Sequence, residues 1–282
     1  MDTLCKFCAG STRSIFLCLL LFGGITGWVE AQDPVATAAA DSAAAVVSDT
    51  ETPKQKLDQK LDGVDASKLP ALALLVARDG KVIYRRVIGL ANLDEQRVAT
   101  ANTKFRIGSI TKQFTAAAIL RLVAEEKLAL DDTLDQFLPT FPRGDEITIH
   151  HLLTHTSGIP SFTETGDFWQ RVTKPTTEAD VIASFQELSL SFEPGKKFHY
   201  NNSGYFLLGH IVGQVSGKSF GDYLQETFFE PLGMTDTGIH SPDLNLENEA
   251  HGYSLEDDAF TPALNWHMSQ VGGAGAMYST VD

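Results

Sequence analysis

The chain has 282 residues, of which 43% are hydrophobic and 21% charged, values that are ordinary for a globular protein. That length allows one large domain or two small ones with a sizeable core. Its 22 Lys and Arg residues against 36 Asp and Glu give a net charge of -14. This charge argues against a binder of nucleic-acid phosphates, because such a protein needs a basic face.

The first 31 residues have the plan of a secretory signal peptide. Lys6 and Arg13 give a basic start, an apolar run follows over residues 15–25, and Ala31 offers a small residue for cleavage. A retained membrane anchor is the alternative, but the run is short for a span of roughly 20 apolar residues. We therefore predict cleavage near Ala31, a secreted or periplasmic location, and no stable membrane anchor after cleavage.

All three cysteines, Cys5, Cys8 and Cys18, lie within this predicted signal peptide. Cleavage after Ala31 leaves a mature protein without cysteine, which must rely on its own core rather than on disulfides. A cysteine nucleophile and a cysteine-ligated zinc are therefore both excluded for the mature protein.

A linker and a short helix are predicted next. Residues 32–53 are Ala-rich, acidic and without aromatics, which is typical of a disordered linker. The folded domain is predicted over 54–282. It begins with a short amphipathic helix that carries Leu57, Leu61 and Val64 near helical spacing.

Two antiparallel strands are predicted near 71–78 and 81–89. The dipeptide Asp79-Gly80 separates two apolar runs there, and an Asp-Gly pair between such runs is a strong hairpin signal. The strand pair is therefore expected to precede the rest of the domain.

From Ser109 onward the pattern is mostly helical. Apolar residues at helical spacing predict a helix from Ser109 to about Glu126. Pro and Gly separate further predicted helices near 148–155, 177–188, 203–216 and 219–229. The chain is therefore expected to have a strand pair first and a long, mostly helical region after it.

Ser109 and Lys112 are the first residues that could carry chemistry. A serine at a helix N-terminus lies where the helix dipole and free N–H groups favour negative charge. Lys112 lies three residues on, one turn away on the same face, where it could activate the serine hydroxyl. The alternative is a serine helix cap beside a surface lysine, which is a common arrangement.

Tyr200 and Asn202 form the second candidate pair. In an extended segment, residues 200 and 202 point the same way, so a phenol and a carboxamide would line one wall of a cleft. Tyr200 beside Lys112 could act as general base toward Ser109, and Asn202 could hydrogen-bond a substrate amide. The alternative is a loop tyrosine packed on the core and an asparagine that caps the next helix.

Together, Ser109-Ile110-Thr111-Lys112 and Tyr200-Asn201-Asn202 resemble the serine β-lactamase and penicillin-binding protein superfamily. The likeness is to its class C-type branch of β-lactamases, DD-peptidases and esterases, and it runs from about residue 55 to the last residue. Further segments carry it: Leu152 to Ile159, Glu193-Pro194-Gly195, Asn202-Ser203-Gly204-Tyr205, Tyr223, and Pro231-Leu232-Gly233-Met234.

The resemblance implies both a fold and an activity. It implies an α/β (α+β) β-lactamase-like fold, with an antiparallel sheet flanked by helices and an all-helical region. It implies a serine hydrolase that forms an acyl-enzyme with a β-lactam, a D-Ala peptide or a carboxylic ester, without metal or cofactor. Ser109 would be the nucleophile, Lys112 and Tyr200 the acid/base pair, and Asn202 would position Lys112 and the substrate amide. The backbone N–H of Ser109 would supply one donor of the oxyanion hole.

The third motif of that superfamily, a Lys-Thr-Gly or His-x-Gly triplet, does not occur between Tyr200 and Asp282. In the family, strands and a helix follow a stretch similar to the one over residues 272–280. We therefore expect a C-terminally truncated chain that lacks the last strands and helix of the fold. A lone hairpin is marginal in water, so such a product is expected to fold poorly or to be catalytically weak.

Two other functions remain open on the sequence. A non-catalytic relative could bind peptidoglycan-type peptides or a protein partner, because the third motif is missing. A zinc hydrolase could use His150, His151 and His155, since two of these histidines are four residues apart on a predicted helix. Histidines also act as caps and as hydrogen-bonding partners in cores, and we favour that structural reading.

Overall fold

The computed structural model describes residues 52–241, 244 and 246–282. The predicted signal peptide and nearly all of the predicted linker lie outside these residues. Thr52 and Pro53, expected at the end of the linker, instead begin helix α1 (Pro53–Asp62). The Thr52 side chain accepts from the Gln55 backbone N–H, and the Gln55 side chain accepts from the Thr52 N–H in return. This capping box fixes the start of the helix.

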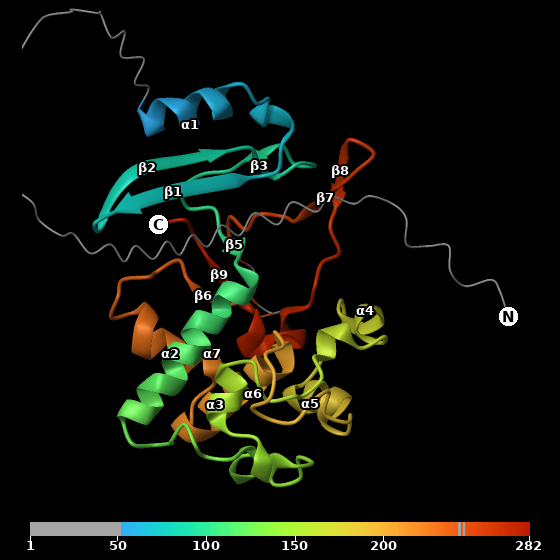
Figure 1. Ribbon diagram of the computed structural model, residues 1–282. Helices are drawn as coiled ribbons and strands as arrows, with labels where there is room; N and C mark the ends of the chain where they lie inside the picture. Colours follow the sequence, from blue (N-terminus) through green and yellow to red (C-terminus); the bar gives the residue numbers. More distant parts are fainter. Residues whose placement is uncertain (1–51, 242–243, 245) are drawn as a thin grey trace, which may run out of the picture. The chain divides into compact units, whose positions relative to one another are not determined.

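The predicted hairpin is formed by β1 (Leu72–Arg78) and β2 (Lys81–Ile88), paired antiparallel. Asp79 and Gly80 in the turn both have positive φ, 51° and 72°, as a two-residue turn of this hand requires. Helix α1 lies against the hairpin (Figure 1), where Asp58 accepts hydrogen bonds from the Tyr84 hydroxyl and the Arg86 guanidinium.

Seven short strands form three further small sheets. Strand β9 (Met277–Ser279) is the middle of one and pairs antiparallel with both β5 (Phe105–Arg106) and β6 (Gly238–Ile239). The other two are β3 (Leu90–Asn92) with β4 (Arg97–Val98) and β7 (Tyr253–Glu256) with β8 (Ala259–Pro262). None of these strands is long enough to show a period in the sequence, which is why the sequence does not predict them.

The helices agree with the predicted segments to within a few residues. They are α2 (Thr111–Ala124), α3 (Ile149–Leu153), α4 (Phe168–Arg171), α5 (Glu178–Gln186), α6 (Asn202–Ser216) and α7 (Phe220–Leu224), and a π-helical turn over 225–229 continues α7. The one-turn helix α4 is unpredicted. No helix in the described part of the chain is both long and apolar enough to cross a membrane.

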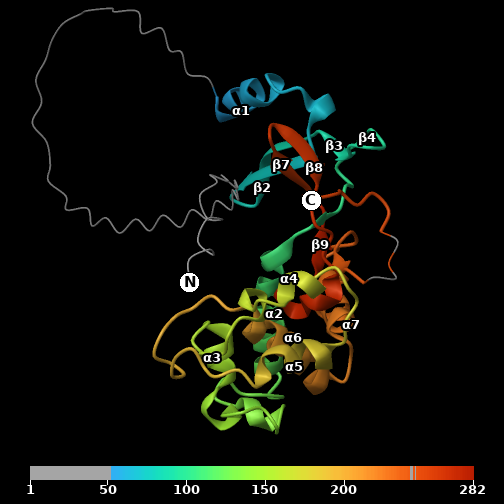
Figure 2. The ribbon, with the colours of Figure 1, turned by 90° about the vertical axis from the view of Figure 1, so that its right-hand side faces the viewer.

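Helix α6 is the centre of the core. It packs against α2, α3, α5 and α7, and it runs beside α2 in both ribbon views (Figures 1 and 2). Ile119 and Leu122 of α2 are fully buried against Leu207, Leu208 and Ile211 of α6. Helices with small antiparallel sheets make an α+β fold, which confirms the predicted fold class.

A glycine contact brings the segment 272–274 onto α6. A Cβ on Gly273 would lie 2.7 Å from the Tyr205 carbonyl oxygen, and a Cβ on Gly209 would lie 3.0 Å from the Gly273 Cα. A Cβ on Gly273 would force the backbone apart, and one on Gly209 would require its neighbour to shift. The two glycines therefore allow the backbone of this segment to reach the start of α2, where the candidate site lies.

Candidate active site

Ser109 lies in a 3-10 turn, η2 (Gly108–Ile110), that leads directly into α2. The helical start predicted at Ser109 is therefore present, but its first turn is tighter than an α-helix. Lys112 is the second residue of α2, and its Nζ donates to Ser109 Oγ at 3.2 Å. Ser109 is exposed to solvent, whereas Lys112 behind it is buried.

Lys112 is 6% exposed, which excludes the surface lysine of the alternative interpretation. Besides Ser109 Oγ, its Nζ donates to Asn202 Oδ1 and to the Ala274 carbonyl, each at 2.8 Å. The three protons of the ammonium thus have three acceptors. Burial nevertheless penalises the charge and lowers the pKa of Lys112 to about 8. Near neutral pH a fraction of Lys112 is therefore uncharged and able to accept a proton.

Asn202 is the first residue of α6, so the prediction of an extended segment through residue 202 is wrong. The extended residue is Asn201, whose side chain caps α6 by accepting from the Gly204 N–H at 2.7 Å. The Asn202 amide donates from Nδ2 to Thr163 Oγ1 at 2.7 Å, which leaves Oδ1 directed at Lys112. Thr163 is a site residue that no sequence motif indicated.

Tyr200 reaches Lys112 with its ring rather than with its hydroxyl. The Nζ of Lys112 lies 4.8 Å from the centre of the Tyr200 ring, within range of a cation–π contact. Within the described residues, the Tyr200 hydroxyl makes no hydrogen bond to Ser109 or Lys112. The structure thus brings all four candidate residues to one place, with Tyr200 half-exposed at its edge (44%).

The segment 273–277 contacts the start of α2 beside Lys112. The Ala274 carbonyl accepts from Lys112 Nζ, and the Gly273 carbonyl accepts from Thr115 Oγ1 at 2.7 Å. The Met277 N–H donates to Thr111 Oγ1 at 3.1 Å. A backbone carbonyl has no side-chain signature, so the sequence does not indicate this acceptor.

His155 supports the Tyr200 side of the site. Its Nδ1 accepts from the Asn201 backbone N–H at 3.0 Å, and its ring centre lies 4.7 Å from that of Tyr200 and 4.9 Å from that of Tyr205. Burial first, and the charge of Lys112 second, lower the pKa of His155 to about 4. At neutral pH the ring is therefore an uncharged acceptor.

The histidines considered for zinc have separate structural partners. His151 Nδ1 accepts from the Thr148 N–H at 3.2 Å and completes the cap of α3, whereas His155 holds Asn201. In the part of the chain that the structure describes, no group of three or more His, Cys, Asp or Glu side chains could hold a metal ion. The arrangement gives the zinc alternative no support.

His155→Asn is expected to remove a pH dependence of stability. Because the folded pKa of about 4 lies below the ordinary 6.5, the unfolded chain binds the extra proton between these values. Wild-type stability is therefore present above pH 6.5 and decreases as the pH falls toward 4. Asn tolerates the left-handed backbone at this position, φ 59°. Melting temperatures between pH 4 and 7 should fall less steeply for the variant; parallel curves would contradict the assignment.

The assembled groups can perform nucleophilic catalysis. A hydroxyl at a helix start contacts a buried amine whose pKa lies near neutrality, and the amine is held by an amide and a carbonyl. This is the nucleophile–base pair, with an orienting third group, that activated serine chemistry requires.

Comparison with known proteins shows which family the chain is similar to. Residues 54–282 match the family model described as Beta-lactamase. The chain is similar to Protein flp of Staphylococcus aureus (strain COL), 31% identical over 242 residues, which make up 83% of this chain and 48% of that protein. It thus spans about half the length of the curated relatives it matches.

Solved structures give the same result. The octameric penicillin-binding protein homologue from Pyrococcus abyssi is 32% identical with a TM-score of 0.69, covering 82% of this chain and 54% of that one. The D-amino acid amidase from Ochrobactrum anthropi SV3, complexed with L-phenylalanine, is 25% identical with a TM-score of 0.69, covering 80% and 67%.

Proposed function

This chain belongs to the beta-lactamase family, and from that premise we propose that it is a serine hydrolase that acts by acyl-enzyme formation on an amide or ester. The observation that carries the proposal is the contact of Lys112 Nζ with Ser109 Oγ at 3.2 Å. A lysine with a pKa of about 8 can take the serine proton at working pH, which an ordinary lysine cannot.

The proposed reaction has two steps, each with its proton accounted for. In the first, uncharged Lys112 accepts the proton of Ser109 as Oγ attacks the carbonyl carbon, and it passes this proton, directly or through Tyr200, to the leaving amine or alcohol as the bond to the carbonyl carbon breaks. In the second, water attacks the ester formed on Ser109 and gives a proton to uncharged Lys112, which returns it to Ser109 Oγ as the ester bond breaks and the carboxylic acid is released. The Ser109 backbone N–H would donate to the developing oxyanion.

The substrate is proposed by class only. A β-lactam, a D-Ala-terminated peptide and a carboxylic ester all present a carbonyl to the same nucleophile. Support for an amide comes from the likeness to a D-amino acid amidase and to a penicillin-binding protein homologue. We propose a small-molecule or peptide substrate and no nucleic-acid partner, in keeping with the net charge of -14.

Mass spectrometry of the intact chain tests the proposal. After incubation with a fluorophosphonate or with benzylpenicillin, a single covalent mass increment is expected, and digestion should place it on the peptide that contains Ser109. Reaction with a D-Ala-D-Ala peptide and with a p-nitrophenyl ester then ranks the substrate classes. Binding of the peptide with no increment from any probe would contradict the hydrolase proposal and favour the non-catalytic alternative.

We also propose that the protein is exported, to the periplasm or outside the cell. The support is the composition of residues 1–31, with two basic residues, an apolar run and Ala31 at the expected cleavage position. The protein recovered from the expressing cells is expected to begin at Gln32, and N-terminal sequencing measures this. A chain that keeps Met1 and stays inside the cell would contradict the proposal.

A further inference from the structure

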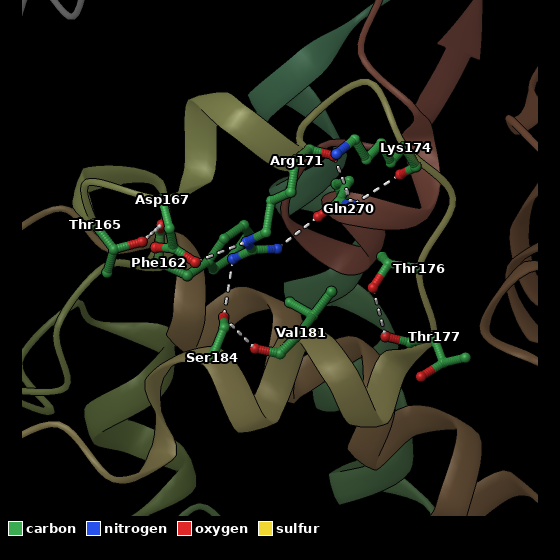
Figure 3. Close-up of polar contacts among 10 residues, drawn as sticks. All are labelled: Phe162, Thr165, Asp167, Arg171, Lys174, Thr176, Thr177, Val181, Ser184 and Gln270. Carbon is green, nitrogen blue, oxygen red and sulfur yellow. Dashed lines mark hydrogen bonds and ion pairs between the residues drawn. The ribbon is translucent and has the colours of Figure 1, made fainter.

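Arg171, the last residue of α4, holds together segments that are distant in the sequence (Figure 3). Its Nη1 donates to Gln270 Oε1 at 2.6 Å and its Nη2 to Ser184 Oγ at 2.9 Å. The guanidinium carbon lies over the rings of Phe162 and Phe168, 6.0 and 5.6 Å from their centres. A planar cation with fixed donors is suited to such a position, where stacking and directed hydrogen bonds are needed together.

Gln270 returns the contact through its own amide. It is 1% exposed, and its Nε2 donates to the carbonyls of Arg171, at 3.1 Å, and of Lys174, at 2.8 Å. A backbone bond from His267 N–H to the Val172 carbonyl at 2.8 Å runs beside it. The Gln270 side chain is buried together with these bonds. An apolar residue in its place would leave the carbonyls of Arg171 and Lys174 without the donor that Nε2 supplies.

One side of this contact leads to Asn202. Phe162, beneath the guanidinium of Arg171, begins the 3-10 turn η5 (Phe162–Glu164). Thr163 in that turn accepts from Asn202 Nδ2, which fixes Oδ1 of the same amide toward Lys112. The position of α4 on this turn therefore affects the first acceptor of the lysine.

The other side leads to Ala274. Gln270 ends the turn η7 (Met268–Gln270), and the next turn, η8 (Gly272–Ala274), carries the carbonyls of Gly273 and Ala274. These carbonyls accept from Thr115 and Lys112 of α2. The position of η7 therefore affects the second acceptor of the lysine.

We propose that Arg171 and Gln270 are positioning residues that fix the two walls between which Lys112 is held. These walls are the turn η5, which orients Asn202 through Thr163, and the turn η8, which carries Ala274. The catalytic consequence rests on the proposed function, because it matters only if Lys112 serves as the base. The physical consequence does not: when the walls separate, water reaches Lys112 Nζ and the desolvation that lowers its pKa is relieved.

The other titratable groups that face Lys112 are two tyrosines and a histidine. Nζ lies 4.8 Å from the ring centre of Tyr200 and 5.6 Å from that of Tyr205, and its charge lowers the pKa of His155. In the part of the chain that the structure describes, none of these three residues hydrogen-bonds Arg171 or Gln270, so variants of that pair leave them in place.

Gln270→Met is the main test. It removes the acceptor of Arg171 and the donor to the carbonyls of Arg171 and Lys174 without changing the charge. The pKa of Lys112 is measured in the 282-residue chain from the pH dependence of its acetylation by a trace of acetic anhydride, followed by mass spectrometry. We expect this pKa to rise by about one unit toward 10.5, which leaves about tenfold less uncharged lysine at pH 7. Labelling of Ser109 by a fluorophosphonate at pH 7 should slow by a similar factor.

Two further variants separate positioning from general stability. Arg171→Lys keeps the charge but lacks the fork that reaches Gln270 and Ser184 together, so it should raise the pKa of Lys112 in the same direction. Ser184→Ala removes the bond between Arg171 and α5, together with the bond from Ser184 Oγ to the Val181 carbonyl within that helix. It is the matched control and is expected to leave the lysine as in the wild type. Far-UV circular dichroism and the Lys112 measurement are made on the same folded samples, and if Gln270→Met does not fold, Arg171→Lys decides.

Each outcome has one meaning. A wild-type pKa of Lys112 in folded Gln270→Met and Arg171→Lys overturns the positioning role. A shift of the same size in Ser184→Ala also overturns it, because the effect would then follow any loss of packing. Absence of Ser109 labelling in the wild type, together with the expected lysine shift in the variants, refutes the proposed function and leaves the positioning role standing.

Discussion

Ser109→Ala is expected to abolish covalent labelling by a fluorophosphonate and to reduce ester or β-lactam hydrolysis by a factor on the order of 10⁴ or more. The reason is that, among the described residues, Lys112 Nζ hydrogen-bonds no other hydroxyl, so no second nucleophile is activated in its place. The fold should be unaffected, since Ser109 is exposed and Ala keeps the helical turn. Initial rates and the intact mass measure the two effects.

Ser254→Ala is the matched control for this variant. Ser254 is likewise exposed, but it lies on β7, away from α2. Its labelling and hydrolysis should equal those of the wild type. Hydrolysis that persists in Ser109→Ala at the wild-type rate would mean that another residue, or a contaminant, carries the activity.

Lys112→Met is expected to lower the rate of Ser109 acylation by about 10² to 10⁴, the usual contribution of a general base. It should also change the pH profile. With a pKa of about 8, the wild-type rate rises with pH and levels off above that value, because only the uncharged amine accepts the serine proton. The variant should lack this rise, which rates measured from pH 6 to 10 would show.

The same variant has an expected effect on stability. The folded pKa of about 8 lies below the ordinary 10.5, so the unfolded chain binds the proton between these values and the free energy of unfolding increases with pH across the window. The increase is up to roughly 3 kcal/mol in the wild type, at about 1.4 kcal/mol per pKa unit. Denaturant unfolding at pH 7 and pH 10 should show the rise in the wild type only. An equal rise in both proteins would assign it to another group.

The fold could be predicted where the structure is local. The hairpin follows from Asp79-Gly80 between two apolar runs, and α2 and α6 follow from apolar residues at helical spacing. The short strands could not be predicted, because β5, β6 and β9 have two or three residues each and exist only by pairing with one another. The predicted extended segment through Asn202 is wrong because the sequence does not show that Asn201 makes the cap.

The site divides in the same way. The contact of Ser109 with Lys112 follows from their spacing of three residues, and the approach of Tyr200 and Asn202 follows from the family resemblance. Ala274 was not foreseen because it acts through its carbonyl. His155 was considered as a zinc ligand, since the spacing of histidines on a predicted helix shows nothing about which backbone N–H each ring will meet.

The carbonyls of Gly273 and Ala274 have a consequence for the order of folding. They bind Thr115 and Lys112 across 158 and 162 residues of sequence, and contacts of such separation form late because the intervening chain must first be ordered. On the ribosome, a nascent chain that ends before residue 273 can already form α2 but cannot enclose Lys112 completely. Its amine then stays hydrated and protonated, and Ser109 remains an ordinary hydroxyl. Under the proposed function, a chain whose residues 273 and 274 have not yet reached α2 is therefore expected to react more slowly with acylating compounds than the folded chain.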